Sequence, residues 1–128
     1  MIILLDTSTP TCKITIINDK KNYDYEWLAE RMLAKDLLAH LNKILDGLGK
    51  TWTDISAIGV FEGPGSFTGL RIGMTVMNTI ADSQDIPING GRGDDWQEVV
   101  LDKLKNGKNE KIVLPFYEHE AHITSPRK

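Results

Sequence analysis

The first part of the chain has the hydrophobic pattern of three consecutive strands. A continuous apolar run at residues 2–5 predicts a buried strand that ends in a turn. Residues 11–17 are rich in β-branched side chains, and after a polar turn Tyr23, Tyr25 and Trp27 alternate with acidic residues. These segments predict an antiparallel three-stranded meander, and the alternation in the third strand indicates that one of its sides faces water.

Helical and strand patterns alternate in the rest of the chain. Leucines at spacings of three and four predict a helix over residues 30–48. The elements expected after it are a strand over 55–61, a helix over 67–82, a short strand over 86–88, a flexible loop over 90–93, a helix from Asp94 or Asp95 to 105, a strand over 112–117 and a hairpin partner over 121–124. Three strands followed by alternating helices and strands predict an α/β domain built on a mixed five-stranded sheet.

Composition and charge narrow the class of protein. The chain has 128 residues, the length of one domain, and a formal net charge of −3. No run of basic residues exceeds a pair, so direct binding of nucleic acid is not expected. The single cysteine, Cys12, fits a reducing compartment. The sequence shows neither a signal peptide nor a membrane span, and we expect a cytoplasmic protein.

A glycine-rich segment, Gly63-Pro64-Gly65-Ser66, joins the strand over 55–61 to the helix over 67–82. A Walker loop is excluded, because the position five after Gly63 is Thr68 and no lysine follows. The dinucleotide pattern G-x-G-x-x-G fails at the same position. Two interpretations stay open. Backbone N–H groups at the helix N-terminus could hold an anion, or the segment is a tight turn in which Ser66 caps the helix, which we favour.

The helix over 67–82 has two apolar stripes rather than one. One stripe contains Phe67, Leu70, Met74 and Met77; the opposite stripe contains Ile72, Val76 and Ile80. We expect the rigid β-branched stripe to pack on the sheet and the methionine-containing stripe to face a partner, although sequence alone permits the reverse. The stripe of the helix over 30–48 is also wide. Both helices could simply cover each other in one core, but leftover apolar surface of this kind favours a protein contact.

Few residues are candidates for catalysis or for binding a metal or phosphate. Asp6, at the end of the first strand, could orient a phosphate or a metal-bound water, but accepting hydrogen bonds within its turn is the favoured role. His119 and His122 are three residues apart, which on a strand points them to opposite faces, and we expect no metal site. His40 is expected on a helix surface, and Cys12 is expected to be packed in the core.

Two segments together resemble the bacterial TsaB (YeaZ) family. These are Leu4-Leu5-Asp6-Thr7-Ser8 and the eleven-residue run from Gly63 to Gly73, G-P-G-S-F-T-G-L-R-I-G. The resemblance implies an actin-like (ASKHA) fold, which in the family normally has two lobes. Residues 1–110 would form the N-terminal lobe and residues 111–128 a short strand or hairpin remnant. The second lobe would be largely missing.

The resemblance also implies a function. Members of the family are non-catalytic partners of a TsaD-type catalytic subunit and a TsaE-type ATPase in making threonylcarbamoyladenosine in tRNA, and they form homodimers when TsaD is absent. The contact is made by the two N-terminal helices, so the expected partner-binding residues are Leu37, Leu38, Leu41, Leu45, Phe67, Leu70, Arg71, Met74 and Met77. Candidate contacts to a nucleotide or anion are Asp6, Thr7, Ser8, Gly63 and Gly65. No cofactor is expected. The alternative is an ASKHA-type ATPase or metal-dependent hydrolase completed by a second chain.

Overall fold

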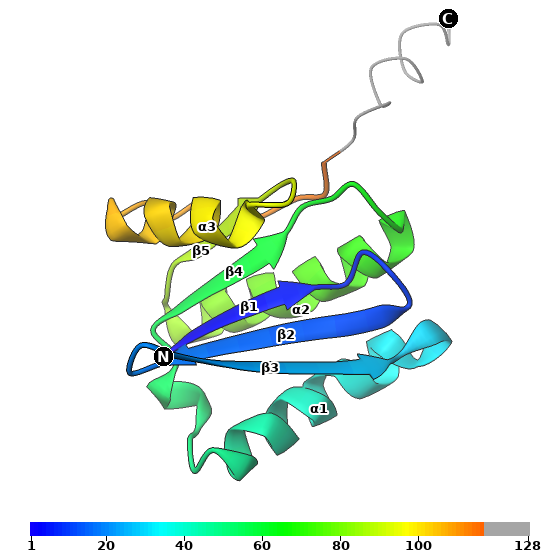
Figure 1. Cartoon of the computed structure of the whole chain (residues 1–128), viewed down its shortest axis with the longest axis horizontal. Coiled ribbons are helices and arrows are strands. Elements are labelled where there is room, and N and C mark those ends of the chain that lie inside the picture. Colours follow the sequence, from blue (N-terminus) through cyan, green and yellow to red (C-terminus); the bar gives the residue numbers. More distant parts are fainter. Residues whose placement is uncertain (117–128) are drawn as a thin grey trace, which may run out of the picture.

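A five-stranded mixed sheet organises residues 1–116, the part of the chain that the structure, a computed structural model, describes (Figure 1). Its elements in chain order are β1 (Ile2–Asp6), β2 (Thr11–Asn18), β3 (Lys21–Leu28), a 3₁₀ turn (Glu30–Met32), α1 (Leu33–Gly47), a second 3₁₀ turn (Trp52–Asp54), β4 (Ala57–Phe61), α2 (Phe67–Gln84), β5 (Ile88–Gly91) and α3 (Trp96–Lys105). The predicted α/β class is confirmed.

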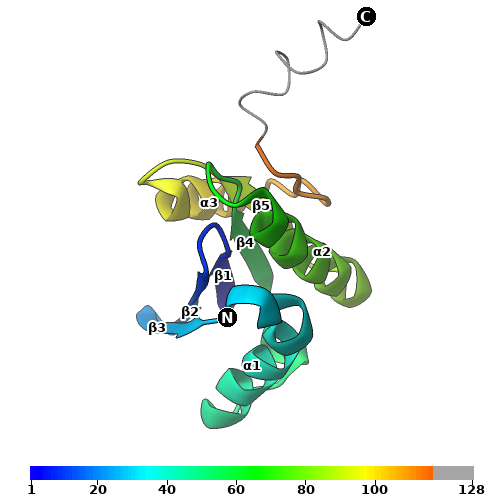
Figure 2. The ribbon, with the colours of Figure 1, turned by 90° about the vertical axis from the view of Figure 1, so that its right-hand side faces the viewer.

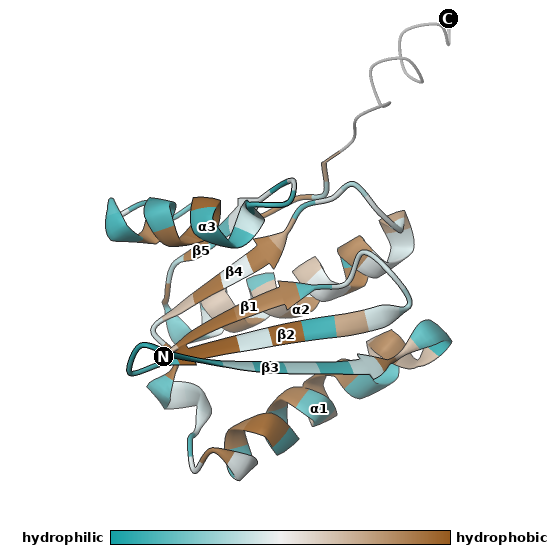
Figure 3. Ribbon diagram, viewed as in Figure 1, coloured by the Kyte–Doolittle hydropathy of each residue, from teal (hydrophilic) through white to brown (hydrophobic). Residues whose placement is uncertain are grey.

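The strand order is β3-β2-β1-β4-β5. The first three strands form the predicted antiparallel meander, and β4 and β5 add in parallel to β1. The central strand β1 pairs on both sides, with Leu5 opposite Ile14 of β2 and Val60 of β4. A strand buried on both faces needs apolar side chains at successive positions, which explains the continuous run at its start. Figure 3 shows the same feature, since β1 and β4 are far more hydrophobic than the edge strand β3.

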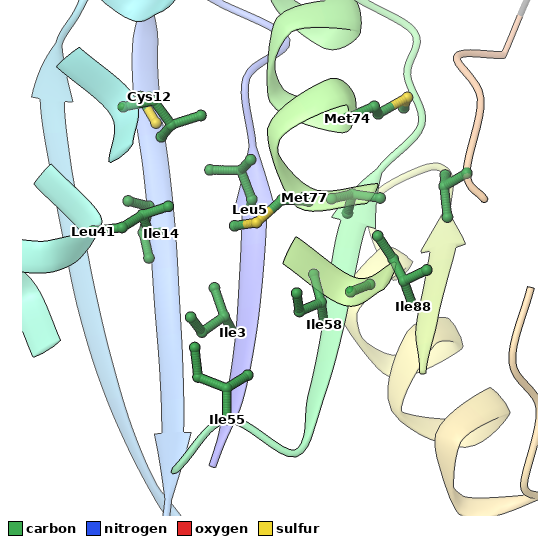
Figure 4. Close-up of a cluster of buried hydrophobic side chains, with 14 of the residues drawn as sticks. Ile3, Leu5, Cys12, Ile14, Leu41, Ile55, Ile58, Met74, Met77 and Ile88 are labelled. Atoms are coloured by element: carbon green, nitrogen blue, oxygen red, sulfur yellow. The ribbon is translucent and has the colours of Figure 1, made fainter. Parts of the chain in front are cut away.

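Helices cover both faces of the sheet. α1 and α2 lie on one face and α3 lies on the other (Figure 2). Ile3 and Leu5 of β1 belong to the larger core, shared with α1 and α2, while Leu4 packs with Trp96 and Val100 of α3. Figure 4 shows side chains of the larger core converging from the strands and from α1 and α2. Successive side chains of β1 therefore belong alternately to two separate apolar layers, one on each face of the sheet.

Cys12 lies in the larger core, which confirms its predicted packing role. Burial raises the pKa of its thiol to about 12, with a further upward contribution from the Asp6 carboxylate. A thiol held protonated in this way is a poor nucleophile.

The prediction for residues 86–93 was wrong in detail. β5 spans Ile88–Gly91, so Gly90 and Gly91 belong to the sheet and not to a flexible loop. The glycines are needed there for close packing: a Cβ on Gly90 would collide with the Glu62 side chain, and one on Gly91 with the Trp96 backbone. α3 begins where predicted, after Asp95, but without a side-chain capping bond.

The strand predicted over residues 112–117 is not formed over residues 112–116. There the backbone bonds to the Asn78 side chain and to the Glu62 backbone, and no ladder forms with a neighbouring strand. The Asn78 amide donates to the Val113 carbonyl oxygen and accepts from the Val113 N–H, both at 2.9 Å. The Phe116 N–H donates to the Glu62 carbonyl oxygen at 2.8 Å. Tyr117, the hairpin partner over 121–124, His119 and His122 lie outside the described residues.

Candidate protein-binding face

The glycine-rich segment brings the start of α2 against the turn between β1 and β2. The Thr7 hydroxyl donates to the Gly69 carbonyl oxygen at 2.7 Å, and the Ser66 N–H donates to the Ser8 carbonyl oxygen at 2.8 Å. A Cβ on Gly69 would overlap the Thr7 carbonyl oxygen, and a Cβ on Gly73 would overlap the Thr7 side chain. The glycines thus permit a helix to lie directly on a turn.

Of the residues considered for a nucleotide or anion, Asp6, Thr7, Ser8 and Gly65 lie at this turn, and Asp6, Thr7 and Ser8 make hydrogen bonds within the chain. One carboxylate oxygen of Asp6 accepts from the Ser8 N–H at 2.9 Å and from the Ser8 hydroxyl at 2.6 Å, which confirms the predicted turn role. Gly63 adopts a positive φ of 123° and Gly65 packs on Ser8. Ser66 caps α2 as predicted, since its hydroxyl oxygen accepts from the Gly69 N–H at 3.2 Å. This arrangement favours the structural interpretation of the loop.

The predicted orientation of α2 was wrong. The stripe containing Leu70, Met74 and Met77 faces the sheet and is almost fully buried, while Ile72, Val76 and Ile80 are only partly buried. The reason is Gly73, which lies on the first stripe and allows the helix to approach β1 over Thr7 and Leu5. Long, unbranched methionine side chains then fill the space between helix and sheet.

Six of the nine residues expected at a partner contact are therefore part of this chain's own core. They are Leu37, Leu41, Leu45, Leu70, Met74 and Met77, none more than 3% exposed. The other three, Leu38, Phe67 and Arg71, lie at the surface. Leu38 is 49% exposed and Phe67 is 47% exposed, which is high for large apolar side chains.

A groove runs over the outer side of α2 beside α1. Its volume is about 510 Å³, and its lining is Ala34, Phe67, Thr68, Arg71, Ile72, Thr75 and Val76. We call it the α1–α2 groove. A second hollow, of about 490 Å³, shares Thr68 and Ile72 with it and extends toward Pro10 and Arg31. The sequence analysis did not identify Ile72 and Val76 as groove-lining residues, because it predicted that their stripe packs on the sheet.

The remaining candidates for chemistry have structural roles. The His40 ring stacks on Trp27, with ring centroids 3.8 Å apart and planes inclined by 14°. Within residues 1–116, no three histidine, cysteine or acidic side chains cluster as metal ligands would. In the same part of the chain, no helix has both the length and the apolar character of a membrane span.

Comparison with known proteins identifies relatives of this lobe. Residues 27–90 match the model of the TsaD family, tRNA N6-adenosine threonylcarbamoyltransferase. The chain is 34% identical to the tRNA threonylcarbamoyladenosine biosynthesis protein TsaB of Escherichia coli K12 over 89 residues, which is 70% of this chain and 38% of that protein. It is 34% identical to TsaB of Bacillus subtilis 168, over 69% of this chain and 39% of the relative.

Solved structures of YeaZ-like proteins are also similar to this chain. YeaZ from Pseudomonas aeruginosa superimposes with a TM-score of 0.67 at 28% identity, covering 71% of this chain and 43% of that one. The strand order, the helices on both faces and these matches define a single ASKHA-type lobe. The chain belongs to the TsaB (YeaZ) family. It spans only about two fifths of the length of the curated relatives that it matches.

Proposed function

We propose that this chain is a partner subunit of the machinery that makes threonylcarbamoyladenosine in tRNA, and that it binds a TsaD-type catalytic subunit through the α1–α2 groove. The relatives support the pathway, since they are named as threonylcarbamoyladenosine biosynthesis proteins. The TsaD-type partner is the one that the family resemblance implies. In this proposal residues 1–110 are the docking lobe, and a TsaE-type ATPase joins through the catalytic subunit.

The observation that carries the proposal is the exposure of Phe67 beside the groove. An aromatic ring that is nearly half exposed, next to a hollow with apolar and hydroxyl groups, is the kind of anchor on which protein interfaces depend. The groove is bordered by both of the N-terminal helices, which are the elements that the family resemblance assigns to the contact.

The proposed role is that of a binding subunit, with catalysis supplied by the partner. The Asp6 carboxylate is engaged by the Ser8 N–H and hydroxyl, and the loop that begins α2 is occupied by the β1–β2 turn. These hydrogen bonds support structural roles for both groups.

The experiment is a calorimetric titration of this chain with the TsaD-type subunit of the same organism. We expect saturable binding by the wild-type chain and a loss of affinity of at least about 100-fold in Phe67→Asp, because a carboxylate would replace the apolar anchor. The variant should stay folded, since Phe67 is the first residue of α2, where an acidic side chain suits the helix dipole.

Ile112→Asp is the matched control. Ile112 is 64% exposed and lies outside the groove, so the same change there should leave the affinity unaltered. No binding by the wild-type chain, or equal affinities for wild type and folded Phe67→Asp, would contradict the proposal.

A further inference from the structure

The edge of the sheet at β3 has the features of a docking site for an extended polypeptide. β3 is the last strand on its side, and in the described chain its strand neighbour is β2 (Figure 1). Alternate residues of an edge strand turn their N–H and C=O groups away from the sheet. Apart from the ladder with β2, no backbone–backbone hydrogen bond joins residues 21–28 to another part of residues 1–116. The eight residues of β3 therefore offer an open edge to an added strand.

One side of this edge has an apolar hollow. Tyr25 and Trp27 pack in part on the larger core, and the Trp27 ring is held by its stack on His40. The hollow between β3 and α1 has a volume of about 380 Å³, and its lining is Tyr25, Glu26, Trp27, His40, Lys43, Ile44 and Gly47. Lys43 is exposed, so its ammonium group stays in water when its methylene groups are covered. Every second side chain of an added strand would point to this side, where an apolar group fits.

The other side of the edge is acidic. Asp24 and Glu26 are exposed, and none of the ion pairs found in residues 1–116 involves either carboxylate. The Thr15 hydroxyl donates to one oxygen of Asp24 at 2.7 Å, and Lys13 is the cross-strand neighbour of Glu26. Two carboxylates beside one lysine leave an excess of negative charge. Basic side chains at alternate positions of an added strand would lie next to these carboxylates, and opposite charges across strands are stabilising.

A second copy of β3 fits this edge less well. In an antiparallel pair of β3 strands centred on Tyr25, Asp24 of one copy lies opposite Glu26 of the other. Like charges directly opposite each other in a sheet are destabilising. This argument concerns the β3 edge alone, and it leaves any pairing of two copies through α1 and α2 unaffected.

We infer that the β3 edge binds an extended segment of another protein in which basic and apolar residues alternate. The backbone of the segment adds a strand to the sheet, its basic side chains lie beside Asp24 and Glu26, and its apolar side chains enter the hollow next to Trp27. The acidic pair acts as a specificity element, because it favours a basic strand and disfavours an acidic one. This inference goes beyond the proposed function, since it involves neither the α1–α2 groove nor the TsaD-type subunit.

The test uses a synthetic octapeptide of alternating lysine and valine, titrated into the isotope-labelled full chain and followed by amide NMR spectra. We expect saturable binding, with the largest shifts at the amides of β3. An octapeptide of alternating glutamate and valine should bind at least about tenfold more weakly. Methylation of the backbone nitrogens of the lysine–valine peptide should weaken binding by a similar factor, because it removes the donors that pair with β3.

A pair of charge-reversal variants tests the acidic side of the edge. Glu26→Lys should weaken binding of the lysine–valine peptide about tenfold, and since Glu26 is exposed the variant should stay folded, as its own spectrum would show. Asp82→Lys makes the same change at an exposed acidic residue of α2 and should leave the affinity unaltered.

Four results would overturn the inference. The first is no saturable binding at millimolar peptide, and the second is equal affinity for the lysine–valine and glutamate–valine peptides. The third is a set of shifts that maps outside β3 and the hollow beside it. The fourth is a dependence of the β3 amide shifts on the concentration of the chain without peptide, which would mean that a second copy occupies the edge.

Discussion

Met74→Glu is expected to unfold the lobe. Met74 is 3% exposed, on the face of α2 that packs on the sheet, and a carboxylate there would have no water and no designated partner. The cost of burying the charge, added to the lost apolar packing, exceeds roughly 4 kcal/mol, a large part of the stability of a domain of this size. Circular dichroism during urea unfolding gives the measurement.

Thr75→Glu is the matched control for this prediction. Thr75 is the next residue along α2, is exposed, and lines the groove instead of the core. We expect its free energy of unfolding to change by no more than about 0.5 kcal/mol. A folded Met74→Glu together with an unfolded Thr75→Glu would mean that the helix faces are the reverse of those described.

Gly69→Ala is expected to destabilise the lobe by about 3 kcal/mol, although alanine is the better helix former by about 1 kcal/mol. The new methyl group would overlap the Thr7 carbonyl oxygen, a backbone atom that cannot rotate away. To relieve the overlap, α2 must move off the β1–β2 turn. That movement breaks the hydrogen bond from the Thr7 hydroxyl to the Gly69 carbonyl oxygen.

Gly47→Ala tests the same substitution without the contact. Gly47 is the last residue of α1, and no atom lies within 4 Å of a Cβ placed on it. Here the change should be neutral or stabilising by up to about 1 kcal/mol, as measured by the urea midpoint. Opposite signs for the two variants are the expected result. If Gly69→Ala stabilises as much as Gly47→Ala, the glycine does not serve close packing.

The sheet was predictable from sequence because burial leaves a direct pattern. The run at residues 2–5 is apolar at successive positions since helices cover both sides of β1, and the alternation in β3 follows from its single covered side. The predictions were wrong where glycines, or the side-chain amide of Asn78, determine the backbone conformation. Gly90 and Gly91 suggested flexibility, but they provide close packing in β5; residues 112–116 have a strand-like pattern, yet Asn78 takes the place of a strand partner.

The candidate binding face could be predicted only in part, and its role in binding a partner stays a prediction. The two wide helices and the glycine segment pointed to α1 and α2, and Leu38, Phe67 and Arg71 do lie at the surface. The sequence did not show which stripe of α2 faces the sheet, because both stripes are apolar and their hydrophobicity does not distinguish them. Gly73 was the informative residue, because a glycine in one stripe marks the side on which another backbone comes close.

Photo-crosslinking from position 67 to the purified TsaD-type subunit tests the central claim most directly. A photoreactive phenylalanine analogue replaces Phe67 in one sample and Ile112 in a second sample, at two exposed sites of which only the first lines the α1–α2 groove. After irradiation, mass spectrometry identifies the adducts. The account predicts a covalent adduct with the TsaD-type subunit from position 67 and none from position 112. An adduct from position 112 alone, or none from either position, would contradict it.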